Sequence, residues 1–155
     1  MAKFTVGKGL DQYLSQLENL EFRADGMAGM AIYEGAKIVA DTIKANLQAM
    51  PTSKPERVPD GTRRNPWPSE KAGMVAGLGI SKKATDGSFI NVKIGMHGYN
   101  AIERPNVVVM RSFEAGNSFC KRLAPVSRAV RASRGAAEEA IKAKIEEEIQ
   151  KTMKG

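Results

Sequence analysis

Apolar residues recur at three- and four-residue steps in two stretches near the start of the chain, the spacing typical of amphipathic helices. The first stretch predicts a helix from about 9 to 21, with its apolar face formed by Leu10, Tyr13, Leu14, Leu17 and Leu20. The second predicts a helix over residues 26–49, with one face formed by Ala28, Ile32, Gly35, Ala36, Val39, Ile43 and Leu47. Asp25 is the expected N-cap between the two helices.

Residues 51–72 interrupt this periodicity, because five prolines fall within them. Proline lacks a backbone N–H and breaks both helices and central strands, so we expect neither element here. The stretch also carries Arg57, Arg63, Arg64 and the only tryptophan, Trp67. We therefore expect a long, basic, flexible loop with Trp67 as its anchor.

A β-hairpin follows the loop. Residues 80–85 and 88–96 flank Asp86-Gly87, a pair suited to the positive-φ turn that joins twisted strands. The second strand alternates apolar and other residues, and the apolar positions are Ile90, Val92, Ile94 and Met96. This alternation predicts one buried face.

Residues 105–119 leave two interpretations open. The valine run from Val107 favours a strand, whereas Pro105 before it and Gly116 after it favour a helix. Residues 125–154 predict a long terminal helix, with an apolar row formed by Ala137, Ile141, Ile145, Ile149 and Met153. Together, the four steps of four residues turn this row by roughly 160° around the helix axis. The tip of the helix therefore faces a different direction from its start.

The chain has 155 residues, 42% hydrophobic and 26% charged, as expected for a single globular domain spanning 1–155. Together with the elements above, this predicts an α+β fold in which the 26–49 and terminal helices pack across a small antiparallel sheet containing the hairpin. No apolar run reaches the roughly 18 residues that a bilayer crossing needs, so no membrane partner is expected.

Candidate chemistry is sparse. His97 is the only histidine and Cys120 the only cysteine, which removes disulfides and the usual zinc ligand sets. Neither residue lies in a motif that supplies an acid, a base or an activated nucleophile. We therefore expect no catalytic residue, no cofactor and no metal, and predict that the chain is not an enzyme.

Positive charge is the more informative feature, because 24 Lys and Arg against 17 Asp and Glu give a net charge of +7. Five basic residues between positions 118 and 137 have no acidic neighbour in sequence, and this candidate basic face comprises Lys121, Arg122, Arg128, Arg131 and Arg134. It predicts either a solvated helix face or a surface for phosphates. Aromatic residues for base stacking are not interleaved with it, so any DNA contact would be directed to the backbone.

Two short stretches resemble a known family. Residues 111–117 read Arg-Ser-Phe-Glu-Ala-Gly-Asn, and residues 125–129 read Pro-Val-Ser-Arg-Ala before an Ala/Glu/Lys-rich helix. This combination resembles the HK-97-like phage tail-component family, in which Glu-aromatic-Gly-Thr precedes a Pro-aromatic-x-Arg-Pro-Ala segment. The matching positions are Glu114, Gly116, Pro125 and Arg128, and the departures are Ala115, Asn117, Val126 and Ala129.

Residues 73–81 echo a further motif that precedes the hairpin of that family, and the order of elements matches across about 10–153. The resemblance implies that residues 105–115 form a helix. It also implies a structural virion protein of a tailed bacteriophage or prophage, a tail component that forms a ring at the head–tail junction as a neck or tail-completion protein. Its implied location is the virion, after assembly in the cytoplasm of the bacterial host.

The partners implied are other copies of the chain, other phage head-completion and tail proteins, and DNA contacted non-specifically in the lumen of the ring. We expect the proline-rich loop and the tip of the terminal helix to pack only against other chains. The candidate interface residues are Arg57, Arg63, Arg64, Trp67, Ile149 and Met153. The alternative function is a backbone-directed DNA-binding protein that uses the basic face.

Overall fold

The computed structural model describes residues 8–54, 61–87 and 89–154, with side chains from residue 11 onward. The helices within these residues are α1 (Lys8–Ala49), α2 (Pro68–Gly77), α3 (Asn106–Ala115) and α4 (Pro125–Lys154). The strands are β1 (Leu78–Ile80), β2 (Ala84–Asp86), β3 (Phe89–Asn91) and β4 (Ile94–Met96), and they form two antiparallel pairs. The predicted α+β class, with a small sheet packed on helices, is confirmed. The expectation that α4 also packs across the sheet is wrong, because the strands pack on α1, α2 and α3. In these ranges no helix has the length and apolarity required to cross a bilayer.

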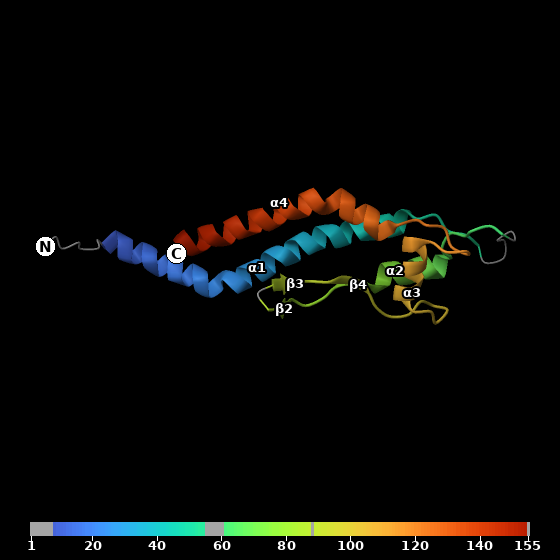
Figure 1. The fold of residues 1–155 in the computed structure, drawn as a ribbon, viewed down its shortest axis with the longest axis horizontal. Coiled ribbons are helices and arrows are strands. Elements are labelled where there is room, and N and C mark those ends of the chain that lie inside the picture. Colours follow the sequence, from blue (N-terminus) through green and yellow to red (C-terminus); the bar gives the residue numbers. More distant parts are fainter. Residues whose placement is uncertain (1–7, 55–60, 88, 155) are drawn as a thin grey trace.

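The molecule is elongated, and α1 and α4 lie side by side along most of its length (Figure 1). The hairpin strands lie on the opposite side of α1 from α4, while α2 and α3 gather at one end. We call this end the head; it comprises residues 61–77 and 97–128 together with the last turns of α1. The N-terminal half of α1 and the C-terminal half of α4 extend away from the head as a two-helix arm.

The two long helices approach closely where small residues face each other. Ala31 and Ala137 are buried, and a Cβ at Gly35 would lie only 3.2 Å from the carbonyl oxygen of Ala137. Side chains of α1 also hydrogen-bond to the backbone of α4 near both of its ends, Gln16 Nε2 to the Met153 carbonyl at 2.7 Å and Asn46 Nδ2 to the Pro125 carbonyl at 3.0 Å. The whole of α4 therefore has a neighbour within its own chain.

Two expectations about these helices are wrong. The predicted break at Asp25 does not occur, because α1 is continuous through Gly26. One glycine inside a helix costs only about 1 kcal/mol, and Met27 and Ala31 are buried immediately beyond it. Because α1 continues unbroken, its first turns run beside the tip of α4, so this tip does not depend on another chain for packing.

Replacing Gly26 by alanine should raise the free energy of unfolding by about 0.5–1 kcal/mol, because alanine loses less backbone entropy in a helix. A Cβ at Gly26 has no neighbour within 4 Å, so no clash opposes this gain. Urea unfolding measures the change. Gly77→Ala is the matched control, since its Cβ would collide with the backbone carbonyl of His97 and lower the stability. An equal response at the two positions would contradict an unbroken α1.

A hairpin forms as predicted, but its turn lies one residue later than expected, because Asp86 pairs with Phe89. The register of its two halves differs by one residue. Thr85 pairs with Ile90 near the turn, and Gly79 pairs with Gly95 near the base. Between them, the Ser81 N–H donates to the Lys93 carbonyl at 2.7 Å, while the Lys93 N–H donates to Ser81 Oγ at 2.8 Å. The side chain thus replaces a missing backbone partner. Gly87 in the turn has φ +60, a conformation that favours glycine.

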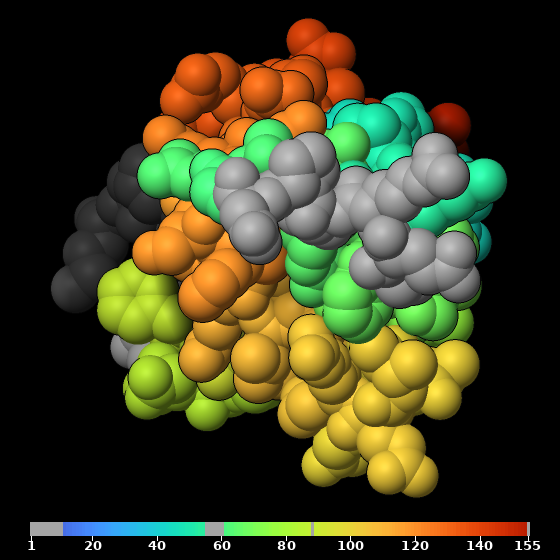
Figure 2. Space-filling view, turned by 90° about the vertical axis from the view of Figure 1, so that its right-hand side faces the viewer, coloured from blue at the N-terminus to red at the C-terminus, as the bar shows by residue number. Residues whose placement is uncertain are grey.

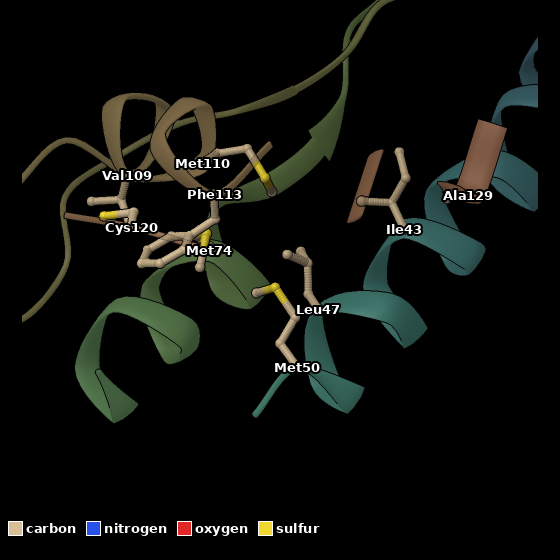
Figure 3. Packing of buried hydrophobic residues seen from close by; sticks show 9 residues of the cluster. All are labelled: Ile43, Leu47, Met50, Met74, Val109, Met110, Phe113, Cys120 and Ala129. Atoms are coloured by element: carbon tan, nitrogen blue, oxygen red, sulfur yellow. The ribbon is translucent and has the colours of Figure 1, made fainter. Parts of the chain in front are cut away.

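The head has its own hydrophobic core, in which the end of α1 meets α2 and α3 (Figure 3). Phe113 of α3 is fully buried at its centre, and its carbonyl accepts hydrogen bonds from the N–H groups of Leu123 and Ala124. The other members of the cluster are Ile43, Leu47, Met50, Met74, Val109, Met110, Cys120 and Ala129. The open question at 105–119 is settled as a helix, which begins after Pro105 and ends before Gly116 (φ +73).

The described part of the proline-rich stretch packs on the head, contrary to expectation. Pro66 is fully buried, and Arg64 pairs with the backbone beside Cys120: its N–H donates to the Phe119 carbonyl at 2.8 Å, and its carbonyl accepts from the Lys121 N–H at 2.9 Å. The expectation that residues 51–72 contain no helix is also wrong, because α2 begins at Pro68. Proline is suited to the first turn of a helix, where its missing N–H is not needed.

Candidate functional site

A buried carboxylate organises the head. Glu70 lies in the first turn of α2, and its side chain is 1% exposed. Both of its oxygens accept hydrogen bonds from the guanidinium of Arg64, at 2.6 and 2.9 Å. One of them also accepts the backbone N–H of Trp67 at 2.9 Å, which satisfies a donor at the start of α2. The Glu70 carboxylate therefore joins the segment around Arg64 to α2, the helix that follows it.

The electrostatics of this pair favour its charged form. Burial alone would raise the pKa of Glu70, but the hydrogen bonds from Arg64 and from the Trp67 N–H outweigh it and hold the pKa below the ordinary value. The hydrogen bonds between the two side chains also raise the pKa of Arg64. Two-pronged arginine–carboxylate bonds are among the stronger and more directional contacts in proteins. The pair is thus charged at neutral pH.

Aromatic rings surround the arginine. The Arg64 guanidinium lies 4.2 Å from the centre of the Trp67 ring and 5.5 Å from that of Phe113, distances suited to cation–π contact. Arg104 is half exposed; it lies 3.6 Å from Glu70 and 5.5 Å from the Trp67 ring. The cluster of two guanidinium groups and one carboxylate carries one net positive charge.

A cleft of about 640 Å³ opens beside this cluster. Its walls combine the charged groups with apolar side chains of α3 and of the segment before Cys120, and the lining includes Trp67, Val108, Phe113, Phe119 and Cys120. Figure 2 looks onto this end of the molecule, where green residues of the 61–72 segment lie next to orange residues that follow α3. The volume falls within the range of small-molecule sites.

The cleft does not present an activated nucleophile. Cys120 is buried, and burial raises the pKa of its thiol although the Arg64 charge opposes the effect. The thiol is therefore protonated at neutral pH and a poor nucleophile. His97 lies elsewhere, exposed between β4 and α3, with its carbonyl accepting a hydrogen bond from Asn106. In the described ranges no group of three His, Cys, Asp or Glu residues could hold a metal ion.

The candidate basic face divides in two. Arg122, Arg128 and Arg131 line one groove of about 190 Å³ together with Ala124 and Ser127. Arg134, by contrast, pairs with Glu138 on its own helix at 3.1 Å. Lys121 is exposed, and its backbone N–H donates a hydrogen bond to the Arg64 carbonyl. Three of the five predicted residues are therefore brought together.

The candidate interface residues are dispersed. Arg64 and Trp67 belong to the buried cluster, whereas Arg63 is exposed on the head. Ile149 is exposed near the end of α4, and Met153 is half-buried, with its carbonyl accepting from Gln16. Arg57 lies within 55–60, outside the described residues. These positions do not form one continuous surface among the residues described.

Sequence reasoning missed Glu70 and Arg104, the partners of Arg64. A local signal existed for Glu70, because Pro68 followed two residues later by a glutamate is a typical first turn of a helix. Arg104 carried no comparable signal, since its approach to Glu70 depends on how the segment before α3 folds back. Comparisons with family models, curated proteins and solved structures found no match to this chain.

Proposed function

We propose that this chain is a structural virion protein of a tailed bacteriophage or prophage, a tail component that self-associates into a ring at the head–tail junction. The observation that carries the proposal is the exposed apolar surface of the arm. On α1, Phe22 is 90% exposed and Leu14 is 47% exposed, on a helix that α4 covers from one side only. Apolar side chains at such a site favour a protein contact.

The residues that carry the family resemblance support a structural role. The Glu114 carboxylate accepts hydrogen bonds from the N–H groups of Val126 and Ser127, both at 2.9 Å, at the first turn of α4. Gly116 supplies the positive φ that ends α3, and Pro125 is buried where α4 begins. Glu114, Gly116 and Pro125 therefore form the joint between two helices, whereas the fourth matched residue, Arg128, is exposed in the basic groove.

The proposed mechanism is surface complementarity between subunits, without catalysis. Identical subunits joined by two different surfaces form a closed ring when the repeated rotation from one neighbour to the next returns to the first subunit. They form a filament when it does not. A stiff two-helix arm fixes this rotation better than a loop would. In the proposed setting the ring also contacts other head-completion and tail proteins, and it assembles in the host cytoplasm before it becomes part of the virion.

Self-association of the full chain tests this function. We expect sedimentation velocity to show oligomers that grow with concentration to a limiting size, and electron microscopy to show closed rings. Phe22→Ser should shift this equilibrium toward monomer by about tenfold, since it removes a large apolar contact. Phe89→Ser is the matched control, since Phe89 is a phenylalanine of the hairpin that is 78% exposed. A monomer at every attainable concentration would contradict the proposal.

The second candidate function is DNA-backbone binding, which the convergence of Arg122, Arg128 and Arg131 in one groove supports. Affinity for a random duplex should then fall steeply and linearly with the logarithm of salt concentration, because each neutralised phosphate releases a counterion. Replacing Arg128 and Arg131 together by glutamine should reduce that slope by about two. Weak binding that depends neither on salt concentration nor on the two arginine substitutions would rule out DNA-backbone binding.

A further inference from the structure

One face of the arm is an uninterrupted acidic stripe. Its residues share one side of α1 and are all exposed: Asp11, Leu14, Glu18, Glu21, Phe22 and Asp25. At about 100° per residue, they fall within about 100° of the helix circumference. Arg23 lies on the other side of the helix. Lys83 of the hairpin reaches the Asp25 end of the stripe, where its Nζ donates to the Asp25 carbonyl at 3.4 Å. The stripe thus combines four negative charges with two exposed apolar side chains.

The opposite charge gathers on the head and the first turns of α4. From residue 99 to residue 134 there are seven basic residues and two acidic ones. One of those two, Glu114, is held at the start of α4 by the N–H groups of Val126 and Ser127. Arg122, Arg128 and Arg131 share one groove there. The groove therefore offers the positive charge that the stripe requires.

The stripe and the groove cannot meet within one molecule. Asn46 hydrogen-bonds to the Pro125 carbonyl and so marks the level of the groove along α1. It lies 28 residues beyond Glu18, a separation of about 42 Å along a continuous helix. Figure 1 shows the same arrangement, with the start of α1 and the start of α4 toward opposite ends of the molecule. The complementary surfaces can only be joined between two copies.

We propose that the acidic stripe of one copy docks on the Arg122–Arg128–Arg131 groove of the next copy. This inference rests on the proposed ring-forming function and names the two surfaces that would build the ring. The contact is head-to-tail, so each copy has one free stripe and one free groove until the ring closes. Charge complementarity steers the encounter and sets the orientation, while Leu14 and Phe22 supply the apolar burial.

Charge reversal tests the contact directly. Glu18→Lys/Glu21→Lys makes the stripe repel the groove, and Arg128→Glu/Arg131→Glu makes the groove repel the stripe. Each variant alone should self-associate at least about tenfold more weakly than the wild type in sedimentation velocity. An equimolar mixture of the two should recover oligomers of wild-type size, because every junction between unlike copies then joins opposite charges. Urea unfolding checks that each variant is folded.

The matched control is Glu139→Lys/Glu146→Lys, which makes the same change of charge on exposed positions of α4 and should leave association unchanged. Wild-type assembly that survives both reversals would overturn the docking proposal while leaving the ring itself standing. Absence of any wild-type oligomer would overturn both. If only the groove reversal acts, and duplex DNA binding is lost with it, the groove serves nucleic acid and the docking proposal fails.

Discussion

Replacing Arg64 by methionine is expected to lower the free energy of unfolding by about 3–5 kcal/mol, because the buried Glu70 charge loses its hydrogen-bonded partner and keeps only the half-exposed Arg104, 3.6 Å away. Glu70 is 1% exposed and relies on Arg64 for two of its hydrogen bonds. Methionine keeps much of the apolar stem of arginine but removes the guanidinium. Urea unfolding at neutral pH measures the loss.

The matched control for this prediction is Arg134→Met, which breaks an Arg–Glu pair on the exposed face of α4. It should cost less than about 1 kcal/mol, as exposed pairs do. The double variant Arg64→Met/Glu70→Gln should be more stable than Arg64→Met, because the glutamine is neutral and still accepts the Trp67 N–H. Equal costs for Arg64→Met and Arg134→Met would show that the charge at Glu70 is not isolated from water.

The Arg64–Glu70 pair also determines how the stability lost in Arg64→Met depends on pH. The pKa of Glu70 is lower in the folded chain than the ordinary value of about 4.3, so ionisation stabilises the fold above that value. This stabilisation disappears as the pH falls through the folded pKa. The difference in stability between the wild type and Arg64→Met should therefore narrow in acid.

Replacing Phe113 by alanine should cost about 3–5 kcal/mol, because it opens a cavity in the centre of the head core. Phe113 is fully buried, and the sulfur-containing side chains of Met74 and Cys120 lie close to its ring (Figure 3). The ring also contributes one of the two aromatic faces beside Arg64. Thermal and urea unfolding both measure this effect.

Phe119→Ala provides the matched control, since Phe119 is 76% exposed only six residues further along the chain. Its removal should change stability by less than about 0.5 kcal/mol. If the two substitutions had similar effects, α3 would not be packed as described. A large loss of stability for Phe113→Ala but not for Phe119→Ala would support the packing of the head core, which positions the cleft.

Local periodicity was sufficient to predict α4, the helical character of both halves of α1 and the hairpin, although it did not predict that the two halves of α1 are continuous. The apolar row of α4 and the alternation from Ile90 to Met96 both arise from residues close in sequence, and each repeats with the period of its element. The helix at 105–115 needed more than the residues themselves, because its valine run and its flanking proline and glycine indicate different structures. The family resemblance predicted a helix there, and α3 confirms it.

The candidate site could be predicted only in part. The basic run 121–134 was visible in the sequence, and three of its members do share one groove. The buried cluster around Glu70 was not visible in the sequence, although Arg64 and Trp67 were predicted to be interface residues. Proline density led to the expectation of a free loop, whereas the backbone of Arg64 pairs beside Cys120, 56 residues later. Such a pairing leaves no periodic signal.

The sequence by itself determined the amphipathic helices, the existence of the hairpin, the positive charge of residues 118–137 and the scarcity of histidine and cysteine. These properties depend on residue type and on spacing within a few turns. Only the tertiary structure decided that α1 continues through Gly26, that Glu70 is buried beneath Arg64, and that acidic and basic surfaces lie too far apart to meet. The reason is physical, because burial and separation depend on segments distant in sequence, and their free energies outweigh the local cost of one glycine or one proline.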